Sequence, residues 1–228
     1  MLDSPRVVII GAGVAGMTTA YALSQLGISF RVLEASGRAG GRLEADDTFA
    51  DFPIPLGAEW IETDLAIFGE IVGDPDFPAV PETFPDGPDH KFHRSSWMNF
   101  FETHVLPSIE GHIDFNEAVV GIDYAGDGVI IDTNGAQFAA EQVVVAVPLS
   151  VLKNPGIEFT PPLPATKQAA IDSIEIWGGF KAFFEFSQPF FDGPDEFAVP
   201  VGSGHKLYYE ASWNQDSPHH IYALFCVG

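Results

Sequence analysis

Residues 7–16 read Val-Val-Ile-Ile-Gly-Ala-Gly-Val-Ala-Gly, a short apolar run that leads directly into a turn with three glycines. The run over 7–10 is β-branched and short, as in a buried parallel strand. Gly11 permits a tight turn, Gly13 leaves room for a pyrophosphate, and Gly16 lets the following helix pack closely on the strand. The stretch therefore predicts the first strand, turn and helix of a dinucleotide-binding site.

The residues after the turn complete a strand–helix–strand unit. A helix is predicted over 14–26, with its unpaired N-terminal amides directed at the phosphates and Gly27 as its C-cap. A second strand over 29–33 ends at Glu34. A carboxylate there accepts hydrogen bonds from the ribose hydroxyls of adenosine and repels a 2′-phosphate, so the sequence favours NAD or FAD over NADP.

The composition indicates a globular chain that is strongly acidic. Its 228 residues are 46% hydrophobic, enough for one large or two small domains with a substantial core. The formal charge is −22, from 10 basic and 32 acidic residues, which is inconsistent with a surface that binds nucleic acid. Because the acids are spread along the whole chain, we interpret them as a solvation feature suited to a salty environment. A negative field that attracts cationic amines is the alternative.

Neither a membrane segment nor a metal site is expected. No apolar run approaches the ~20 residues of a membrane span, and the first ten residues do not resemble a signal peptide, so a cytoplasmic location is expected. The single cysteine, Cys226, excludes an internal disulfide and a cysteine-based metal site, and we interpret it as a small hydrophobe. The pairs His90 with His93 and His219 with His220 are interpreted as surface histidines.

Local patterns predict the remaining elements. Residues 73–90 hold five prolines, which predicts a connector or surface loop without a regular element. Apolar residues at helical spacing predict one helix over 95–109, with its aromatic stripe in the core. Turn signals between short alternating segments predict a β-meander. Its strands are expected over 113–115, 119–124, 129–133 and 137–139, followed by a strand over 143–147, a helix over 165–174, and strands over 180–186, 206–209 and 221–227.

Two blocks in the first quarter of the chain carry a resemblance to a known family. The first joins the glycine turn to Glu34-Ala35 and to Gly40-Gly41-Arg42. The second is Leu-Gly-Ala-Glu-Trp at 56–60.

Two further blocks follow in the same order. The third comprises 143–149 with Leu152 and 159–164, and the fourth is 179–191, in which Lys181 precedes Pro189, Phe190 and Phe191. Together the four blocks resemble the flavin-dependent amine oxidases, which include monoamine, polyamine and L-amino-acid oxidases.

The resemblance implies an α/β fold with FAD as the cofactor. It implies a Rossmann-like FAD/NAD(P)-binding domain with a β-meander, over 1–73 and 102–155, and a partial α+β substrate domain over 74–101 and 156–228. The residues that it assigns to FAD binding are Gly11, Gly13, Val14, Ala15, Gly16, Glu34, Ala35, Gly40, Gly41, Arg42, Gly57, Ala58, Glu59, Trp60 and Val119. Of these, Arg42 is expected at the pyrophosphate, 56–60 against the flavin ring, and Val119 at the adenine end.

The resemblance also implies a catalytic residue, Lys181, which holds a water near flavin N5. Lys181 is the single cation in an otherwise apolar strand, a setting in which ionisable groups are often functional. The expected reaction is hydride transfer from the carbon next to an amine to the flavin, with the resulting imine hydrolysed by water. Oxygen is the expected electron acceptor, and the product is hydrogen peroxide.

Two other functions stay open. One is a non-catalytic nucleotide-binding module or subunit, and the other is a desaturase or protoporphyrinogen-oxidase-like FAD enzyme, which shares the first block. The strand that contains Lys181 favours an oxidase of small-molecule amines or amino acids over the desaturase or protoporphyrinogen-oxidase-like enzyme, and the non-catalytic module stays open.

The sequence departs from the family pattern in two main respects. The segment over 62–112 is short for a substrate cavity, and the glycine-glutamate motif of the family's C-terminal stretch does not occur. Ser36 stands where many relatives have an arginine, and Pro55 where an acidic residue is common. We therefore expect a fragment or truncated member, whose FAD site a partner segment completes.

Overall fold

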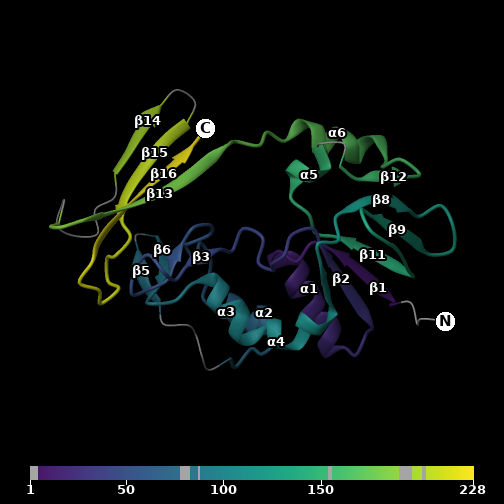
Figure 1. The fold of residues 1–228 in the computed structure, drawn as a ribbon, viewed down its shortest axis with the longest axis horizontal. Helices are drawn as coiled ribbons and strands as arrows, with labels where there is room; N and C mark the ends of the chain where they lie inside the picture. Colours follow the sequence, from purple (N-terminus) through teal and green to yellow (C-terminus); the bar gives the residue numbers. More distant parts are fainter. Residues whose placement is uncertain (1–4, 78–82, 87, 154–155, 190–196, 202–203) are drawn as a thin grey trace. The chain divides into compact units, whose positions relative to one another are not determined.

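The computed structural model describes residues 5–77, 83–86, 88–153, 156–189, 197–201 and 204–228 (Figure 1). The chain divides into two compact units. Unit 1 comprises Met1–Arg42, Ile71–Gly73 and Phe101–Ile176, and unit 2 comprises Leu43–Glu70, Asp74–Phe100 and Trp177–Gly228. The predicted domains place 43–70 and 156–176 in the opposite groups, so their assignment to cofactor and substrate binding stays a prediction.

Unit 1 contains a parallel sheet of the kind that the glycine turn predicts. Its order is β11(Gln142–Val145), β1(Val7–Ile10), β2(Phe30–Glu34) and β7(Ile113–Phe115), and every neighbouring pair is parallel. All four residues of β1 are buried, as expected for a strand with neighbours on both sides. Helix α1(Val14–Gln25) connects β1 to its parallel neighbour β2, which makes a βαβ unit, the connection that is right-handed in nearly all proteins. The predicted α/β class is confirmed.

A second sheet of unit 1 contains the meander. Its order is β10(Gln137–Ala140), β9(Val129–Thr133), β8(Val119–Asp123) and β12(Glu158–Thr160), with antiparallel pairs except for β12 against β8. The segment over 113–115, predicted as a meander strand, is instead β7 of the parallel sheet.

One ion pair helps to explain where β7 pairs. The guanidinium of Arg31, on β2, donates to both carboxylate oxygens of Asp114 on β7. Bidentate pairs of this kind specify geometry as well as energy. Because the two residues are 83 positions apart, the local turn signals could not reveal this pairing.

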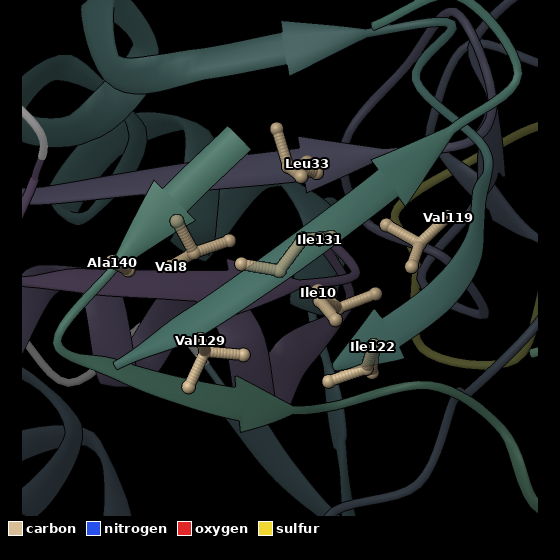
Figure 2. Close-up of a cluster of buried hydrophobic side chains, with 8 residues drawn as sticks. All are labelled: Val8, Ile10, Leu33, Val119, Ile122, Val129, Ile131 and Ala140. Carbon is tan, nitrogen blue, oxygen red and sulfur yellow. The ribbon is translucent and has the colours of Figure 1, made fainter. Parts of the chain in front are cut away.

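The two sheets of unit 1 share a hydrophobic core. Figure 2 shows side chains from the parallel sheet and from the meander directed toward one another. Each large aliphatic side chain buried in this way contributes about 1.5–3 kcal/mol to stability. The buried members are Val8, Ile10, Leu33, Val119, Ile122, Val129, Ile131 and Ala140.

The predicted helix over 95–109 is two helices. They are α3(Trp97–His104) and α4(Leu106–Ile109), and a short 3₁₀ turn, η1(Glu110–His112), follows them. Pro107 causes the interruption, because proline has no N–H to donate and its ring clashes with the preceding turn, whereas the first turn of a new helix accepts it. The stripe is buried as predicted at Phe100, Phe101, Val105 and Ile109, which are at most 2% exposed, whereas Trp97 at its start is only partly buried.

The remaining helices of the described chain are short. They are α2(Ile67–Val72), α5(Leu149–Lys153) and α6(Ala165–Ser173). Within the described residues, no helix has the length and apolar character needed to cross a bilayer.

Unit 2 is built on an antiparallel sheet. Its order is β13(Gly179–Phe186), β16(His220–Val227), β15(Gly204–Glu210) and β14(Phe197–Val201), and the strands lie side by side in Figure 1. A core cluster of this unit joins the sheet to a small ribbon of two strands, β3(Ala45–Asp46) and β4(Ile54–Pro55). The ribbon contributes Ile54, and Phe52 lies just before it in the chain. The buried members of the cluster are Phe52, Ile54, Tyr209, Ala211, Ile221 and Ala223.

The prediction of an irregular connector over 73–90 is wrong in part. A hairpin forms between β5(Thr83–Asp86) and β6(Asp89–Phe92), although 78–82 and 87 lie outside the described residues. Pro85 is compatible with β5 because edge strands need not donate every N–H. The inner strand, β6, also pairs with Ile61 through a bridge at His90.

Candidate functional site

The glycine turn of unit 1 has the shape that a dinucleotide requires. A Cβ at Gly16 would lie 1.9 Å from the carbonyl oxygen of Gly11, so only glycine permits the close contact of α1 with the turn. Gly11 has φ +100°, which favours glycine. A Cβ at Gly13, by contrast, would meet no atom within 4 Å. The described structure therefore leaves open space at Gly13, beside the start of α1, where a pyrophosphate is expected.

The second glycine pair lies against the first turn. Gly40 forms a parallel bridge with Gly13, and its N–H donates to the carbonyl of Ala12 at 2.8 Å. A Cβ at Gly41 would come within 3.2 Å of the Cα of Gly13. Arg42 follows directly and is exposed. The structure thus brings together two glycine motifs that are separate in the sequence.

Glu34 faces the same turn from the end of β2. Its Oε2 accepts a hydrogen bond from the N–H of Ala12 at 2.7 Å, and its Oε1 accepts from the N–H and hydroxyl of Ser36 at 2.9 and 2.7 Å. A carboxylate has about four acceptor positions, so capacity for a ribose hydroxyl remains. Among the other residues predicted to bind FAD in unit 1, Val14, Ala15 and Ala35 are exposed, whereas Val119 is buried in the core. The contact of Val119 with the adenine stays a prediction.

A second group of predicted residues comes together within unit 2. Lys181 lies on β13, and its ammonium donates to the carbonyl of Gly57 at 2.9 Å and to Oε2 of Glu59 at 2.7 Å. A longer contact, 3.4 Å, joins it to the carbonyl of Pro55. The side chain of Lys181 is only 6% exposed. The lysine of the fourth block and the loop of the second block therefore form one structural site.

The sequence did not reveal that Glu59 is a buried counter-ion. Its side chain is 3% exposed, its Oε1 lies 2.9 Å from the ammonium of Lys91, and its Oε2 accepts from both Lys181 and the hydroxyl of Tyr209. Two lysines thus share one carboxylate. Lys91 and Tyr209 were missed, Lys91 because it directly follows the segment over 73–90 that was interpreted as a connector. Its position between His90 and Phe92 in β6 becomes informative only once the hairpin is known.

Aromatic rings complete this cluster. The ammonium of Lys181 lies 5.1 Å from the ring centroid of Trp60, and that of Lys91 lies 4.9 Å from the ring of Tyr209. Contacts of this kind stabilise desolvated cations. Trp60 is fixed in turn by a hydrogen bond from its Nε1 to Asp86 at 2.8 Å.

The buried environment changes the titration of Glu59. Burial by itself raises the pKa of this carboxyl, but the charges of Lys91 and Lys181 and the hydrogen bonds from Lys181 and Tyr209 outweigh it and hold the pKa below the usual value. Glu59 is therefore ionised at neutral pH.

A cavity lies next to the cluster within unit 2. Its volume is about 300 Å³, including solvent at its mouth. Lys91, Glu59, Ser95, Ser96 and Gln215 supply its polar lining. Its apolar lining comes from Phe52, Pro53, Pro55, Ala58, Phe92 and Ala211.

Comparison with known proteins identifies the family. The sequence model for flavin containing amine oxidoreductases matches residues 102–223, more than half of the chain. The chain belongs to this family. The model for NAD(P)-binding Rossmann-like domains matches 9–69, the region of the glycine turn. FAD is accordingly the cofactor of this family member, and the open space at Gly13, with glycines required at 11 and 16, is consistent with it.

The relatives of this chain include histone demethylases and polyamine oxidases. Mouse lysine-specific histone demethylase 1B is 32% identical over 122 residues, which cover 51% of this chain and 15% of the relative. Human lysine-specific histone demethylase 2 is 25% identical over 317 residues, covering 92% and 39%. Maize polyamine oxidase 1 is 42% identical over 59 residues, covering 25% and 12%. The chain thus spans less than half the length of these relatives.

A solved structure supports the same fold. Wild-type putrescine oxidase bound to putrescine has a TM-score of 0.71 and 15% sequence identity, and the match covers 97% of this chain and 75% of that one.

The aromatic pair that follows Lys181 in the fourth block, Phe190 and Phe191, lies outside the described residues.

Proposed function

We propose that this amine oxidoreductase oxidises a small-molecule amine, with Lys181 as its catalytic residue. The observation that carries the proposal is the burial of the Lys181 ammonium against Gly57 and Glu59. An ammonium this deeply buried is costly unless it is paired, and ionisable groups kept in such settings are functional candidates. The names of the relatives, polyamine oxidase and putrescine oxidase, support an aliphatic amine as the substrate class.

In this proposal the chain's own residues bind FAD, and FAD supplies the oxidation chemistry. The glycine turns with Glu34 and Arg42 would hold the pyrophosphate and ribose of FAD, and the loop over 56–60 would contact its flavin. FAD held there would supply the oxidation chemistry, as the acceptor of a hydride from the carbon next to the amine and as the donor of two electrons to oxygen, which gives hydrogen peroxide. The imine product is hydrolysed by water.

The geometry of Lys181 supports a role in holding water. Its three N–H groups have three acceptors, of which the carbonyl of Pro55 is the most distant at 3.4 Å. This weakest hydrogen bond is the one that a water molecule would replace. Glu59 and Gly57 then keep the ammonium in place while the third N–H orients the water.

The proposal is tested by reconstitution and turnover. The purified chain is mixed with FAD, freed of unbound cofactor and examined for the visible absorbance of bound flavin. Putrescine and spermidine are then added without oxygen, and peroxide is measured after oxygen is admitted. Bleaching of the flavin followed by peroxide formation supports the proposal.

The negative outcomes separate the alternatives. Bound flavin that no amine bleaches would favour the non-catalytic nucleotide-binding module. A chain that retains no flavin by itself, but does so with a supplied C-terminal segment of a relative, would indicate that a partner segment completes the site. No retention in either case would overturn the proposal.

A further inference from the structure

The charges beside the unit 2 cavity do not balance. Lys91 and Lys181 place two ammonium groups on one carboxylate, that of Glu59. The side chains are 5%, 6% and 3% exposed, so water screens this imbalance poorly. One positive charge in the cluster is left uncompensated, and an uncompensated buried charge is expensive.

The two lysines differ in how well their N–H groups are satisfied. Lys181 has three oxygen acceptors, whereas the polar contact found for Lys91 among the described residues is its ion pair with Glu59 Oε1. Its other contacts are with the rings of Trp60 and Tyr209, at 5.6 and 4.9 Å. An ammonium has three donors, so Lys91 keeps donor capacity. The excess charge and the free donors are therefore located at the same atom.

That atom belongs to the lining of the cavity. Lys91, Ser95, Ser96 and Gln215 all line it, and apart from the open solvent at its mouth the cavity has room for about one water-sized group. Both oxygens of Glu59, which also lines the cavity, already accept from Lys91, Lys181 or Tyr209. The charge that remains uncompensated beside the cavity is the positive one.

We propose that this cavity binds a small monovalent anion against the ammonium of Lys91. The anion completes the charge balance of the cluster and accepts the N–H groups that Glu59 leaves unused. The chain's net charge of −22 does not prevent this, because exposed charges are screened beyond about 10 Å at moderate salt, whereas the buried ammonium acts at contact distance. The site requires neither FAD nor an amine.

Bromide is the probe for the first test. Thermal unfolding of the full chain, without added FAD, is followed in sodium bromide and in sodium gluconate at equal ionic strength. With bromide at about ten times its Kd, Tm should be roughly 3 °C higher than in gluconate. The difference should vanish in Lys91→Met and persist in Lys167→Met, an exposed lysine that controls for the loss of one charge. Equal differences in all three proteins would overturn the proposal.

A direct measurement covers the case in which Lys91→Met does not fold. Crystals of the unmodified chain grown in sodium bromide should show an anomalous peak within about 3.5 Å of the Lys91 ammonium nitrogen. A map without that peak would overturn the proposal. Because neither measurement uses flavin or substrate, failure here leaves the proposed oxidase activity intact, and the reverse also holds.

Discussion

The ammonium of Lys181 and the carboxylate of Glu59 lie 2.7 Å apart, although 122 residues separate them in the chain. Both side chains are almost completely buried. The contact joins β13 to the loop over 56–60 and places the predicted catalytic lysine against a residue that was predicted only to contact the cofactor. The stability of unit 2 and the position of Lys181 therefore depend on one carboxylate.

Replacement of Glu59 by glutamine should destabilise the protein strongly. The change leaves two buried ammonium groups without a counter-ion, and breaking a buried pair in this way costs about 3–5 kcal/mol. Urea denaturation measures the loss. Glu62→Gln is the matched control, because Glu62 is exposed and its replacement should change the unfolding free energy by less than about 0.5 kcal/mol. Equal effects of the two variants would contradict the assigned role of Glu59.

The same carboxylate should make stability fall in acid. The pKa of Glu59 is lower in the folded chain than its ordinary value of 4.5, so the stabilisation is complete above that value and is lost as pH falls through the folded pKa. Unfolding free energy measured from pH 6 down to about pH 3 should therefore decline more steeply in the unmodified chain than in Glu59→Gln. Parallel curves would show that Glu59 is not responsible.

Replacement by alanine should destabilise the fold strongly at one glycine of the turn and only weakly at another. Gly16→Ala places a methyl group on the carbonyl of Gly11 and should cost about 3 kcal/mol or more, measured by thermal unfolding. Gly13→Ala meets no atom within 4 Å and has a φ of −76°, so stability should change by less than about 1 kcal/mol. FAD binding should nevertheless weaken in Gly13→Ala, because the methyl group occupies the space for the pyrophosphate. Unchanged FAD affinity in a folded Gly13→Ala would argue against that placement.

His219 should titrate at a higher pH than an ordinary histidine. Its Nδ1 lies 2.6 Å from Oε1 of Glu185, and this hydrogen bond is the main cause of the raised pKa, with the charges of Glu185 and Asp51 adding to it. The stabilisation from this pair is present below about pH 6.5 and is lost as pH rises through the folded pKa. NMR titration of His219 should show the pKa fall in Glu185→Gln. An identical titration in both proteins would remove the pair as its cause.

Loss of Lys181 should slow reoxidation of the flavin if the proposed function holds. Lys181→Met keeps a side chain of similar length but removes the N–H that would orient water. We therefore expect reoxidation of the flavin by oxygen to slow by roughly 100-fold. Stopped-flow absorbance after reduction by an amine measures the rate. Lys206→Met, on β15, is the control and should reoxidise at the normal rate. A normal rate in Lys181→Met would remove this residue from the mechanism.

Local patterns in the sequence were sufficient where neighbouring residues cooperate. The glycine turn, the helix over 14–25 and the strand that bears Lys181 depend on periodicity and on glycine conformations, which are properties of short segments. The errors arose where distant segments compete. β7 joined β2 rather than the meander, and the proline-rich segment formed a hairpin next to Ile61, because pairing partners far along the chain decided both outcomes.

The sequence by itself determined the dinucleotide-binding fold, the carboxylate of Glu34 at the end of β2, and Lys181 as the candidate catalytic residue. Each follows from residue type and from spacing over a few turns or strands. The tertiary structure alone decided that Glu59 is a shared counter-ion and that Lys91 belongs to the same cluster. Ion pairing depends on distance and burial in space, and neither quantity can be read from positions that are 32 and 122 residues apart.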